Sequence, residues 1–250
     1  MMTLHLLGTG AAISDPHRTT TMLAIESERS LIVIDCGADA VQRLMAAGVD
    51  TAKLSALFIT HEHPDHVSGF PLFMEKIWLA GRREPLPVYG IAPALAQAQR
   101  SHDSFNTSDW PGYPGISWHE FAHDANALAL EDDTWTVTTS PGNHSVPVCG
   151  LRIVHKSSGK VVAYSCDTEH SETITELARD ADIFVHEATG DFPGHATALE
   201  AAQSAKESGA KRLLLVHLPP ESALTETQMN EAREVFANTE KGLELGSYSV

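Results

Sequence analysis

The chain has 250 residues, of which 42% are hydrophobic and 20% are charged, the balance of a globular protein. Its formal net charge of −16 disfavours a protein that grips long nucleic acid with a lysine and arginine patch. No run of about 18 apolar residues is present, which argues against a membrane span. We therefore expect one domain over residues 1–250.

The N-terminus and the cysteines favour a cytoplasmic protein. The opening MMTLHLLGTG lacks the basic and long apolar regions of a signal peptide. The three cysteines, Cys36, Cys149 and Cys166, are odd in number and show no C-x-x-C spacing. We expect no disulfide framework and a reducing cytoplasm as the location.

The first half of the chain alternates short apolar segments with amphipathic ones. Strands are expected at 4–7, 22–25, 31–34, 56–59 and 87–91. Helices are expected at 38–47, 70–79 and 92–102. The segment 101–116 is rich in proline, glycine, serine and aspartate, so we expect a long loop that is either a functional lid or a plain surface connection.

The second half repeats this pattern. Strands are expected at 135–139, 149–155, 161–165, 183–186, 213–217 and 243–248, and helices at 172–179, 197–208 and 225–237. Strand clusters interleaved with amphipathic helices favour a layered α/β fold with the helices outside the sheets.

A dense group of metal-ligand side chains directly follows the strand expected at 56–59. The stretch THEHPDHVSG contains His61, His63, Asp65 and His66. Imidazole and carboxylate suit Zn²⁺, Mn²⁺ or Fe²⁺. Side chains two apart on an extended segment face the same way, so His61 and His63 can share one ion while the other two face a second. The alternative is a solvated histidine loop.

Further candidate ligands also follow expected strands. They are His144, Asp167 and His217, and sites on layered α/β folds collect where strands end. Each alone is a weak signal, because a polar residue often ends a buried strand and Asp167 can equally be a helix N-cap. Asp35 is a candidate hydrogen-bond partner for a metal-binding histidine.

These motifs, in this order, resemble the metallo-β-lactamase superfamily. HEHPDH is followed by HSVP, YSCDT, HEAT, GHAT and LLLVH, and the set is most similar to the ribonuclease Z branch. The resemblance implies a four-layer αββα sandwich with two metal ions. It implies that one ion is held by His61, His63 and His144, that the other is held by Asp65, His66 and His217, and that Asp167 bridges them.

The resemblance also implies a catalytic pair. His195 of GHAT corresponds to the histidine near the scissile phosphate, and Glu187 of HEAT corresponds to its acidic partner. A carboxylate that orients an imidazole and raises its pKa suits a general acid. The alternatives are a helix N-terminal histidine and a buried structural glutamate. His186 alternates with Glu187 along its strand, so we expect it to face away from the site.

The chain departs from the tRNA-processing enzymes of the branch. These carry a long tRNA-gripping arm between the histidine and the aspartate that correspond to His144 and Asp167, but only 23 positions separate the two residues here. Cys166 stands where the branch usually has glycine, and Ala196 where it usually has serine. The arm's absence and the net charge argue against tRNA maturation as the main activity.

The leading hypothesis is therefore a binuclear metal-dependent phosphodiesterase that acts through a hydroxide shared by the two ions. Asp65 would orient or deprotonate the water, and the substrate would be a small or cyclic phosphodiester, a nucleotide or a short RNA end. The metal is expected to be zinc, with manganese and iron as alternatives. Other hypotheses are hydrolysis of a carboxylic ester, lactone or sulfate ester, ribonuclease Z-type tRNA 3′-processing, redox chemistry at iron, and a non-catalytic binding module. A homodimer is left open.

Overall fold

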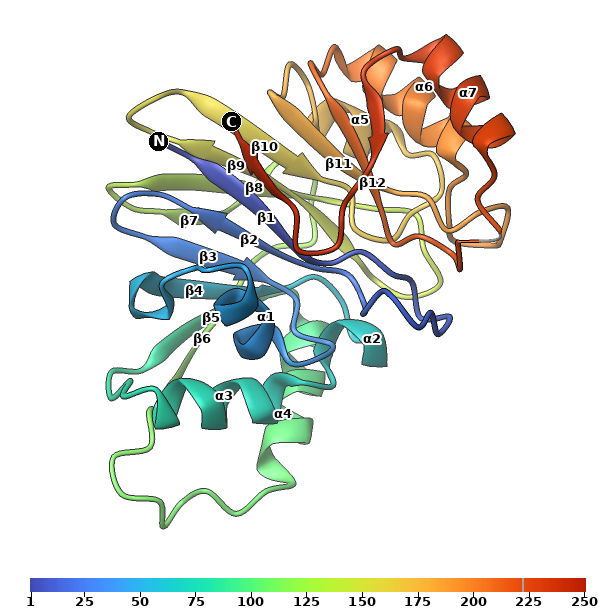
Figure 1. The fold of residues 1–250 in the computed structure, drawn as a ribbon. Helices are drawn as coiled ribbons and strands as arrows, with labels where there is room; N and C mark the ends of the chain where they lie inside the picture. The colour runs from blue at the N-terminus through green and yellow to red at the C-terminus, as the bar shows by residue number, and fades with distance from the viewer. Residues whose placement is uncertain (222) are drawn as a thin grey trace.

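The computed structural model of the protein describes residues 1–221 and 223–250. Two mixed sheets of seven strands each lie face to face, and helices cover their outer surfaces (Figure 1). The predicted four-layer αββα sandwich is confirmed.

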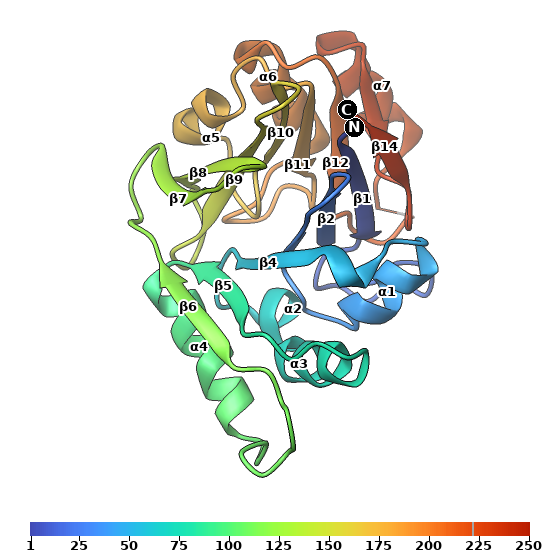
Figure 2. The ribbon, with the colours of Figure 1, turned by 90° about the vertical axis from the view of Figure 1, so that its left-hand side faces the viewer.

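The first sheet contains the two ends of the chain. Its order is β14-β1-β2-β3-β4-β5-β6, with β1 at Thr3–Gly8, β2 at Met22–Glu26, β3 at Leu31–Ile34, β4 at Leu54–Ile59, β5 at Leu86–Gly90, β6 at Ile116–Glu120 and β14 at Ser247–Ser249. Figure 2 shows the termini side by side, where β1 pairs with β14 in antiparallel register. From β3 to β6 the strands are parallel, so their carboxyl ends share one edge.

The second sheet has the order β13-β12-β11-β10-β9-β8-β7. Its strands are β7 at Ala127–Glu131, β8 at Trp135–Pro141, β9 at Cys149–His155, β10 at Lys160–Tyr164, β11 at Ile183–Glu187, β12 at Leu213–Val216 and β13 at Thr239–Lys241. The strands β10 to β13 are parallel, and β7 to β10 form an antiparallel meander.

The helices divide between the two outer faces (Figure 1). On the side of the first sheet are α1 at Ala40–Ala46, a short 3₁₀ turn at Thr51–Lys53, α2 at Pro64–Val67, α3 at Phe70–Leu79 and α4 at Ala92–Asp103. Over the second sheet are α5 at Glu172–Leu177, α6 at Ala198–Ser208 and α7 at Glu226–Val235. Capping boxes begin α6 and α7, where Thr197 and Thr225 accept from the backbone of the third helical residue.

The main core lies between the sheets. One buried cluster joins side chains of both, including Phe58 of β4 and Trp135 of β8. A second cluster fills the space between the second sheet and its helices. Because the larger cluster draws on both halves of the chain, we infer that residues 1–250 form one domain.

Most predicted elements are confirmed. The short helix α2, which carries Asp65 and His66, was not predicted, and the other differences lie at sheet edges. The strands β6, β7 and β13 were not predicted, and the strand expected at 243–248 is wrong, because only Ser247–Ser249 pair with β1. The three cysteines are free, and all three are buried. No described helix is long and apolar enough to cross a membrane.

The predicted long loop connects α4 to β6. Within it, Trp110 and Tyr113 pack on Trp78 of α3, with ring centroids 5.0 and 5.8 Å from the Trp78 ring. The loop leads into Ile116, which pairs with Leu86 at the start of β5. It therefore enters the sheet at the amino-terminal ends of the parallel strands, opposite their carboxyl ends. These contacts fit a surface connection.

Candidate metal centre

The seven predicted ligands meet at one edge of the sandwich, where strands of both sheets end. Residues 61–66 follow β4 of the first sheet. His144 follows β8, Asp167 follows β10 and His217 follows β12 of the second. The site therefore lies between the sheets, and each sheet supplies part of it.

The first group of ligands is His61, His63 and His144. The Nδ1 atom of His63 lies 3.1 Å from His61 Nε2 and 3.2 Å from His144 Nε2. The Oδ2 atom of Asp167 lies 3.9 Å from His61 Nε2 and 4.0 Å from His144 Nε2. Three imidazole nitrogens and one carboxylate oxygen thus surround a common point.

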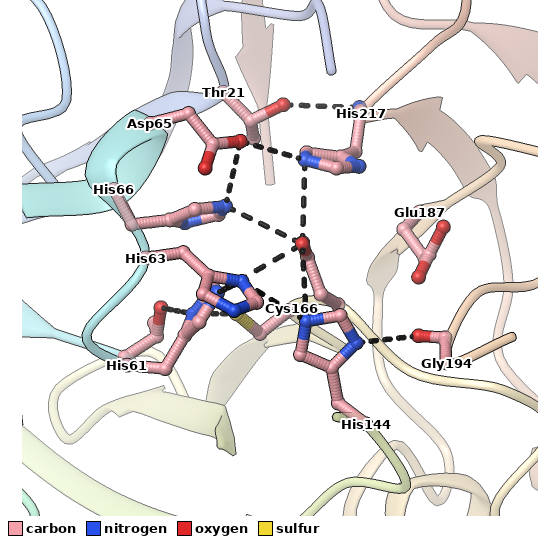
Figure 3. Close-up of polar contacts among 12 residues, drawn as sticks. Thr21, His61, His63, Asp65, His66, His144, Cys166, Glu187, Gly194 and His217 are labelled. Atoms are coloured by element: carbon pink, nitrogen blue, oxygen red, sulfur yellow. Dashed lines mark hydrogen bonds and ion pairs between the residues drawn. The ribbon is translucent and has the colours of Figure 1, made fainter. Parts of the chain in front are cut away.

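The second group of ligands is Asp65, His66 and His217. The Oδ2 atom of Asp65 lies 3.3 Å from His217 Nε2 and 3.5 Å from His66 Nε2. The Oδ2 atom of Asp167 is also 3.3 and 3.5 Å from these two nitrogens. One oxygen of Asp167 therefore belongs to both groups. Figure 3 shows the rings of His66, His144 and His217 facing a common centre.

Four of the five imidazoles are held from behind by their other ring nitrogen. His66 Nδ1 contacts Asp35 Oδ2 at 2.8 Å, and His144 Nδ1 contacts the Gly194 carbonyl at 2.7 Å. His217 Nδ1 contacts Thr189 Oγ1 at 2.6 Å, and His61 Nδ1 contacts Thr60 Oγ1 at 3.1 Å. An Nδ1–H donated outward leaves the lone pair of Nε2 facing inward, which is the tautomer that a metal ligand needs. The predicted role of Asp35 as a histidine partner is confirmed.

Two buried polar atoms at the centre show that the residues fit a cation. Among the described residues, His66 Nε2 and Asp167 Oδ1 have no hydrogen-bond partner. An unpartnered buried polar group is costly, and a divalent cation is a partner that both atoms favour. The His and Asp cluster and the fold together indicate divalent metal binding.

The pKa values of most of these groups favour the protonation state that can bind a metal ion. Burial lowers the pKa of His61 well below its usual value, and it also lowers the pKa of His63. Burial raises the pKa of Asp65, but the imidazoles of His217 and His66 outweigh it and bring the value to about 2. These side chains are therefore neutral imidazoles and an ionised carboxylate at neutral pH.

His66 differs from the other imidazoles. Burial lowers its pKa, but the carboxylates of Asp167 and Asp35 outweigh this effect and raise the pKa well above its usual value. A proton and a metal ion compete for Nε2 of this ring. Metal affinity at the second group should therefore fall as the pH falls.

Glu187 and His195 form a pair beside the second group. Glu187 is fully buried at the end of β11, and its Oε1 accepts from His195 Nδ1 at 2.9 Å. The His195 ring is stacked on His217 with centroids 5.5 Å apart. Burial lowers the pKa of His195, but the hydrogen bond to Glu187 outweighs it and raises the pKa. With Nδ1 held by Glu187, the proton on Nε2 is the one that is free to move.

Several supporting residues were not predicted. Thr189 and Gly194 contact His217 and His144 from distant segments, although both lie inside the HEAT and GHAT motifs. Thr60 contacts the adjacent His61. Cys166, at a φ of 55°, places its Sγ 3.6 Å from His61 Nδ1. A positive φ is a conformation that glycine adopts without steric cost, and glycine is the residue that the family resemblance implies at this position.

His186 faces away from the metal ligands, as predicted. Its ring packs edge-on against Phe184, with centroids 5.1 Å apart, and Phe184 belongs to the cluster beneath the outer helices. The Nδ1 atom of His186 contacts the Glu187 carbonyl at 2.8 Å.

The fold and the metal centre together indicate the class of protein to which the chain belongs. The profile of the beta-lactamase superfamily domain matches residues 31–218, and the chain belongs to this superfamily. Like its homologues, it is a metal-dependent hydrolase.

Its relatives place it near one branch. It is 28% identical to the Ribonuclease Z of Methanothermobacter thermautotrophicus over 305 residues, which covers 100% of this chain and 97% of the relative. It is 30% identical to the Ribonuclease Z of Bacillus velezensis over 301 residues, which covers 95% of this chain and 96% of that one. The first alignment is longer than the 250 residues of this chain, so the archaeal relative carries about 55 residues that the chain lacks.

Solved structures share the fold. The metallo-beta-lactamase fold protein YhfI of Bacillus subtilis matches with a TM-score of 0.82 and 23% identity, covering 100% of both chains. The short form of human tRNase Z matches with a TM-score of 0.81 and 24% identity, covering 99% of this chain and 98% of the other. A diphosphatase of the PhnP family matches with a TM-score of 0.73 and 20% identity, covering 99% and 96%.

Proposed function

We propose that the protein is a binuclear, zinc-dependent phosphodiesterase that acts on a small or cyclic phosphodiester, a nucleotide or a short RNA end. The observation that carries the proposal is the shared carboxylate oxygen. Asp167 Oδ2 lies within 3.3–4.0 Å of ligand nitrogens in both groups, which suits a carboxylate that bridges two cations. Manganese and iron suit the same ligands.

The two groups divide the ligands between the ions. His61, His63 and His144 would hold one ion, and Asp65, His66 and His217 would hold the other, with Asp167 between them. When bound, such ions supply Lewis acidity toward phosphoryl oxygens and lower the pKa of coordinated water.

The chain's own residues supply the proton transfers. Glu187 fixes the tautomer of His195, so that His195 Nε2–H can donate to the leaving oxygen of the substrate. The raised pKa of His195 keeps this proton available near neutral pH. Asp65, ionised over a wide pH range, can accept a hydrogen bond from the attacking water and orient it.

Two features support a small substrate. The chain lacks about 55 residues that the archaeal Ribonuclease Z has, and the sequence resemblance assigns the tRNA-gripping arm to the missing interval. Among the described residues, no lysine or arginine side chain bonds to any of the seven ligands or to the catalytic pair. With a net charge of −16, little remains to hold a long polyanion.

The test is metal content measured together with turnover. The purified protein should contain about two zinc ions per chain and hydrolyse bis(p-nitrophenyl) phosphate, and chelation should abolish both. Aryl ester, sulfate ester and lactone substrates, and a precursor tRNA, are assayed in parallel. Turnover of the esters or lactones without the phosphodiester, or specific cleavage at the tRNA 3′ end, would replace the proposal with the corresponding alternative.

We also propose a cytoplasmic homodimer. The free, buried state of all three cysteines suits a reducing compartment. Leu72 and Leu79 of α3 are 40% and 68% exposed, and they offer an apolar surface for a second copy. Light scattering of the wild type and of Leu79→Glu tests the dimer, and a monomeric wild type would refute it.

A further inference from the structure

Phe192 is an exposed aromatic residue on the loop that carries His195. Its side chain is 53% exposed, and the neighbouring Asp191 and Pro193 are exposed as well. Phe105, which is 60% exposed, is the other phenylalanine among the large exposed hydrophobic side chains of the described chain. Phe105 lies on the loop that packs against α3, whereas Phe192 is three residues from His195 and its carbonyl accepts from the His195 N–H.

The loop around Phe192 is a tight turn of fixed shape. Its backbone N–H donates to the Gly190 carbonyl at 2.8 Å, and its carbonyl accepts from His195 N–H at 3.0 Å. Pro193 and Gly194, with a φ of 83° at Gly194, occupy the two central positions of a turn that suits proline followed by glycine. A Cβ added at Gly190 would lie 3.5 Å from the Phe192 ring, so the ring rests over that glycine.

The turn is also tied to the metal ligands. The Gly194 carbonyl accepts from His144 Nδ1 at 2.7 Å, and the Gly194 N–H donates to Glu169 at 2.8 Å. A Cβ at Gly194 would lie 2.8 Å from His144 Nδ1, so the backbone lies directly against that ring. The backbone of Phe192 is therefore fixed by the same contacts that position His144 and His195. Because the turn is already ordered, a substrate that binds to Phe192 loses little conformational entropy of the protein.

The site has little else with which to grip the organic part of a substrate. The ligands and the catalytic pair act on the phosphate, and no lysine or arginine among the described residues bonds to them. A planar ring stacked on an aromatic side chain contributes binding without charge, and base stacking of this kind is worth about 1–3 kcal/mol.

We propose that Phe192 is a specificity residue whose ring stacks on a planar ring, a nucleobase or an aryl group, that belongs to the group retained on the phosphate and not to the leaving group. This inference rests on the proposed phosphodiesterase function and narrows its substrate class. It assigns ring recognition to the turn at 190–195 and not to the aromatic residues of the loop between α4 and β6.

The experiment uses three phosphodiesters that share one leaving group, p-nitrophenolate. Their second groups are thymidine 5′-yl, phenyl and methyl. In Phe192→Ala, KM for the thymidine diester should rise by about 5- to 100-fold with little change in kcat, while the values for the methyl diester should stay unchanged. Phe192→Trp should retain the wild-type KM, and Phe192→Leu should not. Phe105→Ala is the matched control, because it removes an equally exposed ring from the other loop.

The outcomes separate this inference from the proposed function. A rise in KM for the thymidine and phenyl diesters supports recognition of any planar ring, and a rise for thymidine alone supports a nucleobase. An equal effect on all three diesters, no effect at all, or an effect of Phe105→Ala overturns the role of Phe192. If the wild type hydrolyses none of them, the proposed function fails. The role of Phe192 is then tested by calorimetry, which measures the affinity for thymidine 5′-monophosphate and for inorganic phosphate. Phe192→Ala should then weaken binding of the nucleotide only, and equal nucleotide affinity in both proteins would refute stacking.

Discussion

The replacement of Asp35 by asparagine should remove one metal ion selectively. Asp35 is fully buried, and its Oδ1 accepts from the Thr60 backbone N–H at 2.9 Å while its Oδ2 accepts from His66 Nδ1 at 2.8 Å. Its φ is 61°, a region that asparagine tolerates well. The substitution therefore keeps the shape and the backbone, and it changes only the hydrogen bonds.

Asp35 contacts three donors, the backbone N–H of Thr60, the Thr60 hydroxyl and His66 Nδ1, and the single amide oxygen of asparagine can serve the two donors of Thr60 but not His66 as well. The Thr60 N–H keeps the amide oxygen, so the amide NH₂ takes the place of Oδ2 and faces His66 Nδ1. That nitrogen must then accept, and the ring proton moves to Nε2, which faces Asp65 and Asp167. A protonated Nε2 cannot bind a metal. Loss of such a supporting partner costs 10- to 100-fold in metal affinity, or about 1.4–2.7 kcal/mol.

The assay is competition between the protein and a fluorescent zinc chelator. In Asp35→Asn, one of two zinc dissociation constants should weaken by about 10- to 100-fold while the other changes less, because the first group keeps its own partners. Asp182→Asn is the control, since Asp182 accepts from Val161 and two lysines and none of its partners is a metal ligand. Wild-type affinity for both ions in a folded Asp35→Asn protein would refute the tautomer reasoning.

Four further predictions concern the same centre. His195→Ala should lower kcat by about 10²- to 10⁴-fold at unchanged metal content, and unaltered turnover in the metal-replete variant would remove the general-acid role. Glu187→Gln removes the charge that raises the pKa of His195, so the alkaline limb of the kcat profile should move to lower pH; a profile that stays in place counts against the pair. Chelation should lower Tm, because metal at about 100 times its Kd stabilises the fold by about 2.7 kcal/mol, and an equal Tm with and without metal contradicts this. Zinc affinity should already weaken as the pH falls toward neutrality, above the range in which an ordinary histidine titrates, because Asp35 and Asp167 favour a proton on His66; an affinity that falls only in the ordinary histidine range would show that they do not control that ring.

The interior of the fold could be predicted from the sequence, and the edges could not. The fully buried strand β3 is a continuous apolar, β-branched run, and β9 is buried except at Arg152 and Val154; the bounds of both strands were predicted without error. The strands β6, β7 and β13 are edge strands with half-exposed side chains, so their sequences show neither a long apolar run nor a clean alternation. At 243–248 the apolar residues mostly belong to the turn that precedes β14.

The candidate ligands could also be predicted from the sequence, but the residues that support them could not. Its ligands directly follow strands or share one motif, so local sequence and the family resemblance together located all seven, and the structure brings them together. The partners behind them, such as Thr189 for His217, depend on how loops 28 positions apart meet. Only the assembled fold reveals that contact. Asp35 was predictable because ligating imidazoles require such a partner and a buried strand ends there.

The pairing of β1 with β14 has a consequence for biosynthesis. Thr3 of β1 lies opposite Ser249 of β14. In the first sheet, β1 is therefore synthesised long before the outer strand with which it pairs. Until residue 249 is made, β1 presents an unpaired edge that can capture other strands. His217, in the final sixth of the chain, likewise completes the metal cluster late. Co-translational folding should therefore pass through a nascent chain that lacks both the outer strand of the first sheet and a complete metal centre.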